Sequence, residues 1–334
     1  LEQRETRAQQ WDAKRAAVRY DMISPLSTIG LRSTKHWFAV HDNSIKTDRL
    51  LTLMPLPTKC PIEPNESTRG LVLELFRALH HPYIYPVLDL ELRNGHALTV
   101  LPFNAKGSLK DLLYKSTWSD EYSRKYGSAG TGLPAWQVAR FGRQILEGLL
   151  FLKDKGFPPF RHLHSGNIMV QNGVARICGL ENTLIGARPR SWMCSVPLQH
   201  AEAIGLGHVL FEMCAGTETD LSLLPDLLPN YQNVSKCEYP LFSLLNILYR
   251  FSSDKLLISD LFRKIDLREM KGSCLPVSKN FLLIVFLSSK NCPCSIWNLP
   301  STPQFELLHC CTCQVLNFQN FQNTSFSPQF MIEC

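Results

Sequence analysis

The sequence has little excess charge of either sign and lacks long hydrophobic runs. It carries 35 Lys and Arg against 29 Asp and Glu, a formal net charge of +6, and the basic residues are scattered along the chain. A nucleic-acid-binding surface gathers its positive charge in a patch or stripe, so no nucleic-acid partner is indicated. The apolar run at 281–287 is far shorter than the about 20 residues that a helix needs to span a bilayer, so we expect no transmembrane segment.

Glycine is scarce in the segment that would have to hold the phosphates of a nucleotide. Three short runs at 26–31, 37–41 and 49–54, closed by Pro55 and Pro57, predict a small antiparallel sheet. A loop that cradles phosphates needs several glycines, because backbone N–H groups must approach the ligand closely. Gly30 is the only glycine of this segment. We therefore expect no phosphate cradle.

The twelve cysteines lack the spacing of a metal site. Five are spread over the first 273 residues beside apolar neighbours, which is typical of buried free thiols in a reducing compartment. The other seven crowd toward the C-terminus, in patterns such as Cys292-Pro293-Cys294 rather than the Cys-x-x-Cys of a zinc site. We predict no metal and no cofactor, and we predict that residues 271–334 are a disordered or alternative tail.

The N-terminal segment shows no secretory signal. Because the chain begins at Leu1 rather than Met, we expect it to be a fragment of a longer protein.

Helical patterns with recognisable ends account for most of the remaining chain. Ser67 or Thr68 is predicted to cap a helix over 69–79, and Ser108 a second helix directly after it. A long amphipathic helix is predicted from Pro134 to residue 155, and a buried helix over 202–216. Between the first two helices, Asn94-Gly95 predicts a hairpin that joins strands at 87–92 and 97–103.

The segment after the long helix resembles the catalytic loop of protein kinases. That loop reads His-Arg-Asp, then four residues, then Asn; the Asp accepts the substrate proton and the Asn binds magnesium. Here Phe160-Arg161-His162 stands at the first three positions and Asn167 at the last. Farther on, Gly179-Leu180-Glu181 stands where kinases have the metal-binding Asp-Phe-Gly. The catalytic base and the metal-binding aspartate are therefore missing.

The order of the other motifs also resembles the kinase superfamily. Met54 falls where a strand lysine would pair with the phosphates, and His81-Pro82 matches the junction that follows the first helix. The resemblance implies an α+β, two-lobed protein-kinase-like fold, with a small antiparallel-sheet N-lobe and a mostly helical C-lobe. The expected boundaries are a lead-in at 1–23, an N-lobe at 24–103, a C-lobe at 104–270 and the tail at 271–334.

Within that superfamily the residues of several motifs are similar to those of the slowpoke-binding proteins of insects and, less closely, to those of the PX-domain kinase-like proteins. The motifs are Gly142-Arg143-Gln144-Ile145-Leu146-Glu147, Gly156-Phe157-Pro158, His162-Leu163-His164-Ser165-Gly166-Asn167 and Gly179-Leu180-Glu181-Asn182. The resemblance implies a pseudokinase adaptor that binds the cytoplasmic region of the calcium-activated potassium channel slowpoke, modulates its gating and recruits 14-3-3 proteins. It implies a cytoplasmic location at the channel in the plasma membrane.

Two serines are candidate phosphorylation sites for 14-3-3 binding. Ser191 follows the basic Arg188-Pro189-Arg190, and Ser195 has Pro197 two residues later. An ordinary exposed loop is the competing interpretation of both.

Two alternatives remain beside the adaptor. One is an atypical active Ser/Thr protein kinase with His162 as its general base. It is the weaker hypothesis, because phosphoryl transfer depends on metal and phosphate clamps and losing one such group commonly costs about 10²–10³ in rate. The other is a metal site at His162 and His164, for which no third ligand is evident. ATP binding is not expected but stays open.

Overall fold

The computed structural model describes residues 19–26, 29–30, 34–218 and 261–271. All of them belong to one unit of the chain, Leu1–Cys292. Residues 1–18 of the expected lead-in, residues 219–260 of the expected C-lobe and residues 272–334 of the expected tail lie outside the described residues.

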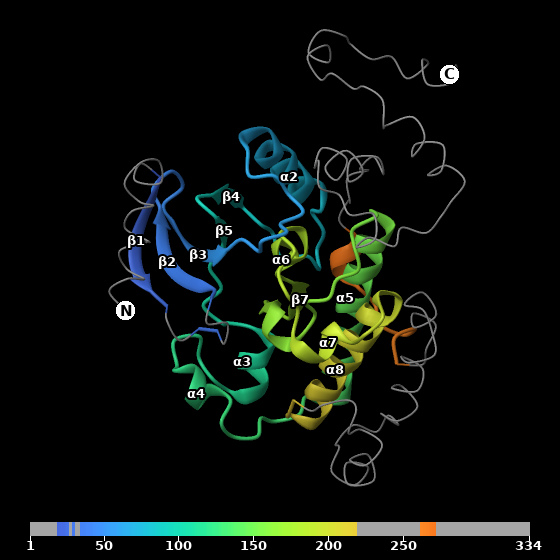
Figure 1. Cartoon of the computed structure of the whole chain (residues 1–334). Helices are drawn as coiled ribbons and strands as arrows, with labels where there is room; N and C mark the ends of the chain where they lie inside the picture. The colour runs from blue at the N-terminus through green and yellow to red at the C-terminus, as the bar shows by residue number, and fades with distance from the viewer. Residues whose placement is uncertain (1–18, 27–28, 31–33, 219–260, 272–334) are drawn as a thin grey trace, which may run out of the picture. The chain divides into compact units, whose positions relative to one another are not determined.

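The first part of the chain forms a five-stranded antiparallel sheet (Figure 1). Its strands lie in the order β1-β2-β3-β5-β4, with β1 at Tyr20–Pro25, β2 at His36–Asp42, β3 at Thr47–Pro55, β4 at Asp89–Arg93 and β5 at His96–Pro102. Alternate residues of a strand point to the same face, and one face here buries an apolar cluster that includes Phe38, Leu51 and Val100. The predicted small antiparallel sheet is confirmed.

The first strand lies earlier in the chain than the sequence predicted. Strand β1 ends at Pro25, and Leu26, Ile29 and Gly30, the described members of the expected strand 26–31, are not in a strand. Tyr20 packs into the sheet's apolar cluster, which draws the chain into the sheet before the expected N-lobe boundary at residue 24. Strand β1 therefore begins four residues before the boundary expected between lead-in and N-lobe.

The hairpin between β4 and β5 forms at the predicted dipeptide. Asn94 and Gly95 have φ angles of 50° and 73°, the left-handed values that a tight two-residue turn requires at both central positions. Asparagine and glycine tolerate these angles better than other residues, so the local sequence determines this turn.

Helix α2 (Glu66–Ala78) begins three residues earlier than predicted and has a different cap. The Oδ1 atom of Asn65 accepts a hydrogen bond from the backbone N–H of Thr68 at 2.8 Å, so Ser67 and Thr68 lie inside the helix. Asparagine is among the best N-cap residues, and here it outcompetes the two hydroxyl residues.

Helix α3 (Leu109–Tyr114) follows the chain segment that leaves the sheet. Its N-terminus has the predicted cap at Ser108: the Ser108 N–H donates to Asp111 Oδ2 at 2.8 Å, and the Asp111 N–H donates to Ser108 Oγ at 3.3 Å. This reciprocal pair satisfies two backbone donors of the first turn. A short helix, α4 (Tyr122–Lys125), comes next.

Helix α5 (Ala135–Asp154) is the centre of the larger core (Figure 1). It packs against α8 (Ala201–Ala215), and a Cβ atom on Gly142 would lie only 2.7 Å from Leu210 Cδ2, so the contact requires glycine. Between these helices come a 3-10 turn η2 (Ser165–Asn167), a hairpin of β6 (Ile168–Gln171) and β7 (Val174–Ile177), and helices α6 (Leu180–Leu184) and α7 (Ser191–Cys194). The predicted two-lobed α+β fold is confirmed.

His81 connects the two parts of the structure through its ring. The imidazole is buried, stacks on the Phe151 ring of α5 at 4.4 Å, and its Nδ1 accepts the backbone N–H of Tyr83 at 3.2 Å. Burial lowers the pKa of His81 from 6.5 to about 4, with smaller repulsion from His80 and Lys155. The neutral ring is thus the form that fits this position.

We predict that His81 makes the fold acid-sensitive. Above pH 6.5 the ring is neutral in the folded and unfolded states, but between pH 6.5 and about 4 only the unfolded state gains the proton. The free energy of unfolding should therefore fall by up to about 3 kcal/mol over this range, and His81→Gln should flatten this part of the profile. Urea unfolding at a series of pH values measures it. The neighbouring exposed His80 supplies the control, since His80→Gln removes only a smaller cause of the pKa shift and should keep most of the slope. A slope in the His81 variant equal to that of the wild-type chain would contradict the assignment.

Candidate functional site

A cavity of about 640 Å³ opens between the sheet and the helical part of the structure. Its walls come from β2, β3 and β5, from the chain between β5 and α3, and from the segments around η2, α6 and α7. Leu101 and Cys178 pack together at its apolar end. The catalytic-loop segment and the segment that follows β7 meet here, which makes this cavity the candidate functional site.

The structure brings some of the predicted site residues together and separates others. Asn167, Gly179 and Glu181 line the cavity, whereas Met54 does not. Met54 packs with Ala97 and Ile185, one step farther along the same face of β3, and Thr52 takes the place on the cavity wall. The Met54 side chain is thus turned into this apolar cluster and does not line the cavity.

His162 also lies outside the cavity wall. Its side chain is buried near the Phe160 ring, and its backbone carbonyl accepts a hydrogen bond from Asn167 Nδ2 at 2.9 Å. Upstream, the Phe160 N–H donates to the Glu202 carboxylate of α8 at 3.1 Å. These bonds hold the shape of the loop and leave the imidazole of His162 without access to the cavity.

Gly179 cannot carry a side chain without displacing its neighbours. Its φ of +89° is in the left-handed region, and a Cβ atom would lie 2.9 Å from Asn182 Nδ2 and 3.1 Å from Asn167 Nδ2. Two carboxamides therefore close over the position where a kinase has its metal-binding aspartate. The local backbone and packing both favour glycine.

A buried ion pair fills the polar end of the cavity. Lys35, the residue before β2, places its Nζ 3.1 Å from Glu181 Oε1 and 3.4 Å from Asn182 Oδ1. The side chains of Lys35 and Glu181 are only 9% and 2% exposed. Because the pair joins the N-lobe to α6 in the C-lobe, it ties the two sides of the cavity together.

The donor set at this end does not fit a divalent cation. It offers one carboxylate, Glu181, and the carboxamides of Asn167 and Asn182, and the Lys35 ammonium already neutralises that carboxylate. Divalent magnesium is normally held by one or two carboxylates that are free to bind it. In the described ranges, no group of three or more His, Cys, Asp or Glu residues could hold a metal, and the proposed His162 and His164 pair belongs to no such group. The tail cysteines lie outside the described residues.

The two candidate phosphoserines lie in an ordered segment. Ser191 is at the start of α7 on the rim of the cavity, and Ser195 Oγ donates to the Trp192 carbonyl at 3.0 Å. Between them, Met193 is buried and its carbonyl accepts a bond from Arg161 Nη2 at 2.5 Å. Either serine is exposed, but an extended peptide conformation would require α7 to unwind.

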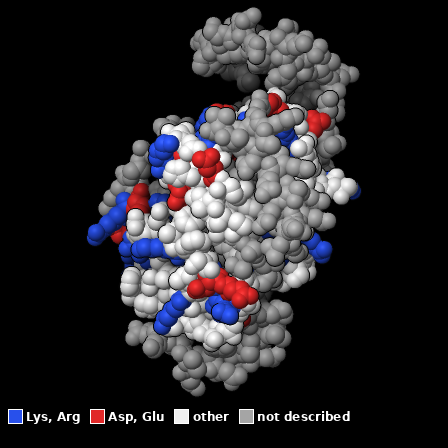
Figure 2. All heavy atoms as spheres, turned by 90° about the vertical axis from the view of Figure 1, so that its left-hand side faces the viewer, with Lys and Arg blue, Asp and Glu red and all other residues white. Residues whose placement is uncertain are grey.

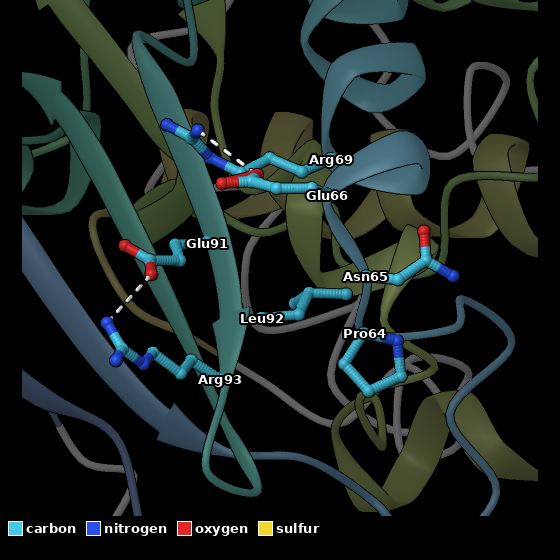
Figure 3. Close-up of a pocket in the computed structure, with 7 residues that line it drawn as sticks. All are labelled: Pro64, Asn65, Glu66, Arg69, Glu91, Leu92 and Arg93. Atoms are coloured by element: carbon cyan, nitrogen blue, oxygen red, sulfur yellow. Dashed lines mark ion pairs between the residues drawn. The ribbon is translucent and has the colours of Figure 1, made fainter.

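A second, polar pocket of about 400 Å³ lies between the start of α2 and β4 (Figure 3). Its charges neutralise one another: Arg69 pairs with Glu66 at 3.5 Å and with Asp89 at 2.8 Å, and Arg93 pairs with Glu91 at 3.7 Å. On the face that Figure 2 shows, Lys and Arg are likewise interspersed with Asp and Glu. Neither feature is a strong site for a charged ligand.

Comparison with known proteins finds slowpoke-binding and kinase-like relatives. Slowpoke-binding protein of Drosophila melanogaster is 42% identical over 337 aligned residues, which cover 88% of this chain and 65% of that protein. The PX domain-containing protein kinase-like protein of Mus musculus is 34% identical over 218 residues, 62% of this chain and 36% of its own length. A probable inactive serine/threonine-protein kinase of Dictyostelium discoideum, slob2, is 36% identical over 214 residues, 60% of this chain and 37% of its own length.

The chain is similar to slowpoke-binding protein over most of its own length. This confirms the resemblance seen in the motifs, although no protein-family model matches the chain. Kinase-like or inactive names recur among the relatives, which agrees with the prediction of a pseudokinase. The chain spans about two thirds of the fly protein and little more than a third of the mouse and Dictyostelium proteins. In the described part of the chain, no helix is long and apolar enough to cross a membrane.

Motif matching did not identify Lys35, the residue that pairs with Glu181 inside the cavity. Lys35 lies in an irregular segment before β2, and no spacing rule links it to Glu181, 146 positions later. The only sequence signal is a lysine beside apolar strand residues, which is too common to be specific. Lys110 and Arg190 also line the cavity, and although Arg190 belongs to the basic segment before Ser191, its sequence position did not predict a place in this cavity.

We predict that removing one member of the buried Lys35 and Glu181 pair destabilises the fold more than removing both. Lys35→Met leaves the Glu181 carboxylate buried and uncompensated, which should lower the free energy of unfolding by about 3–5 kcal/mol. Lys35→Met combined with Glu181→Gln removes both charges and should recover much of the loss. Urea unfolding of the two single variants and the double variant measures the coupling.

An exposed ion pair of α2 provides the control. Arg77 and Glu74 pair at side-chain exposures of 72% and 52%, and Arg77→Met should cost at most about 1 kcal/mol. Equal losses in the Lys35 and Arg77 variants would show that the cavity pair is not the special feature described above.

Proposed function

We propose that this chain is a noncatalytic, kinase-like adaptor that binds the cytoplasmic region of a slowpoke-type calcium-activated potassium channel and modulates its gating. We further propose that it recruits a 14-3-3 protein and resides in the cytoplasm at the channel. The slowpoke-binding relative supports the partner by its name, and the match covers 88% of this chain.

The proposal that the chain is noncatalytic is supported by the residues that line the cavity. The Lys35 ammonium neutralises the Glu181 carboxylate, and Gly179 stands at the position of a metal-binding aspartate. Phosphoryl transfer depends almost entirely on metal ions and cationic clamps that neutralise the charge of the transferred group. Because the Glu181 carboxylate is already paired with Lys35, a structural role for Glu181 is favoured over metal binding. Two rigid parts joined by a cavity remain useful to an adaptor, because a binding surface needs shape and not turnover.

The channel prediction is tested by co-precipitation of the purified chain with the cytoplasmic region of a slowpoke-type channel. The kinase-like region, predicted as residues 24–270, should retain binding without ATP and without residues 274–334. The truncated chain keeps residues 1–23, because strand β1 begins at Tyr20. Thermal unfolding of the truncated chain confirms that it is folded. Loss of binding by the folded truncated chain, or no binding by the full chain, would remove the proposal.

The 14-3-3 prediction concerns Ser191 and Ser195, of which Ser195 is preferred for its Pro197. Phosphorylation would place a doubly charged group beside Trp192, whose carbonyl is the present acceptor of Ser195 Oγ, and would favour opening of the α7 segment. Phosphorylated chain should retain 14-3-3 in a pull-down assay, and Ser195→Ala should reduce the retained amount more than Ser191→Ala. Retention unchanged by both substitutions would assign the site to another part of the protein.

The competing function, an active atypical kinase, has its own test. The chain should transfer no labelled phosphate from ATP to itself or to a generic protein substrate beyond a variant with Asn167→Ala, with or without magnesium. Magnesium-dependent transfer that Asn167→Ala abolishes, while the variant keeps the wild-type melting temperature, would establish the enzyme instead.

A further inference from the structure

Two cations at the far end of the cavity bind one carboxylate of the chain itself. Lys110 Nζ lies 2.6 Å from Glu218 Oε2, and Arg190 Nη1 pairs with Glu218 Oε1. A single carboxylate thus bridges a lysine from α3 and an arginine from the segment before α7. Such a two-cation arrangement is the kind of site that binds a charged carboxylate with charge-assisted hydrogen bonds.

The lysine is held in place before any ligand arrives. Its side chain is only 7% exposed, and Nζ lies over the Tyr126 ring at 4.8 Å and the Tyr114 ring at 5.6 Å. Rings at these distances stabilise a cation and restrict its position. A buried ammonium that is preorganised in this way gains strongly from an anionic partner and loses strongly without one.

Asp111, the acidic residue of α3 next to Lys110, makes its hydrogen bonds with other groups. Asp111 accepts bonds from the Ser108 N–H at 2.8 Å, from Lys125 Nζ at 3.1 Å and from the Tyr126 hydroxyl at 2.8 Å. It therefore serves the helix cap and Lys125. The carboxylate that Lys110 and Arg190 share is that of Glu218.

Glu212 of α8 lies beneath the two cations. Burial raises the pKa of this carboxyl, an effect that Ser165, Lys110 and Arg190 oppose. The ion pairs of Lys110 and Arg190 are with Glu218.

Glu218 is placed as a replaceable ligand. Its side chain is 37% exposed, and it follows Gly216, whose φ of +74° ends α8. Besides its carboxylate contacts, its backbone N–H donates to the Tyr114 hydroxyl at 3.1 Å. A side-chain rotation would free both cations. The buried Lys35 and Glu181 pair at the other end of the cavity has no comparable solvent access.

We propose that Lys110 and Arg190 form a binding site for a glutamate or aspartate of an acidic partner peptide, and that Glu218 is the internal ligand which this peptide displaces. The same cavity is lined by Trp118, Tyr122 and Trp192, which give apolar surface for the peptide's neighbouring side chains. A cavity of about 640 Å³ has room for such a segment, whereas a free inorganic anion would use only the two cations. This inference does not depend on the identity of the channel partner.

The internal carboxylate should weaken binding by occupying the site part of the time. If the site is open about one tenth of the time, removing the competitor tightens the apparent affinity about tenfold. Glu218→Gln is the variant that removes the charge while keeping the side chain's size. Its affinity should exceed that of the wild-type chain, and higher salt should weaken the binding of both.

The probe is a fluorescein-labelled hexapeptide of alternating glutamate and leucine, with the glutamine and leucine hexapeptide as its uncharged match. Fluorescence anisotropy should show tighter binding of the acidic peptide to Glu218→Gln than to wild type. Binding should fall at least about tenfold when Arg190→Gln is added, since one bidentate partner is lost. Lys110→Met in the same background should act similarly, and melting temperatures verify folding. Arg93→Gln, at the second pocket, is the charge-matched control and should leave the affinity unchanged.

Three results would overturn the proposal. The first is no gain in affinity for folded Glu218→Gln. The second is equal binding of the glutamine peptide, which would assign the effect to the apolar wall. The third is displacement of the acidic peptide by inorganic phosphate at the same concentration, which would mean a simple anion site without peptide recognition. Because no channel segment is used, these outcomes are independent of the channel proposal.

Discussion

The buried ion pair of Lys35 and Glu181 is the constraint on which the cavity depends. Two charges removed from water cost several kcal/mol each, and this cost is offset only if the pair stays together with its hydrogen bonds in place. Asn182 supplies one of those bonds, and its carboxamide in turn closes over Gly179. The position of α6 against the sheet, the required glycine and the loss of a metal-binding carboxylate are thus consequences of one arrangement.

The cavity is lined by two charged groups that differ in solvent access. At one end the pair is buried on both sides, and breaking it would expose an uncompensated charge to an apolar interior. At the other, Lys110 is fixed by tyrosine rings, but its carboxylate partner Glu218 reaches the site from the solvent side. The first end therefore maintains the structure, and the second can exchange ligands. Such a division suits a kinase-like protein that binds partners, because the fold is secured separately from the binding site.

The parts of the fold that local sequence predicted correctly are those with local physical causes. Asn94-Gly95 formed its turn because two left-handed residues are required there, and Ser108 capped α3 through its own neighbour Asp111. The long helix also formed as predicted, since its apolar stripe and its ends at Pro134 and Gly156 lie within one segment. Each of these causes acts over a few residues.

The differences between prediction and structure arose where several residues could fill one structural role. Asn65 took the cap that Ser67 or Thr68 was expected to provide, and Tyr20 joined the sheet because its ring packs with residues of β2 and β3. Met54 lies on the same face of β3 as Thr52, yet only Thr52 lines the cavity, because the alternating pattern specifies a face of the strand and not the position along it. Sequence spacing could not resolve that difference.

By itself the sequence determined the kinase-like order of elements, the resemblance to slowpoke-binding proteins and the replacement of the catalytic aspartates by His162 and Gly179, because these are properties of motifs read along the chain. Only the tertiary structure decided what stands in their place. Lys35 reaches Glu181 across 146 positions, and Arg190 and Lys110 meet at Glu218, because folding brings together charges that have no local relation. The low dielectric of a buried site then strengthens these charge interactions, and burial is a property of the packed molecule rather than of any one segment.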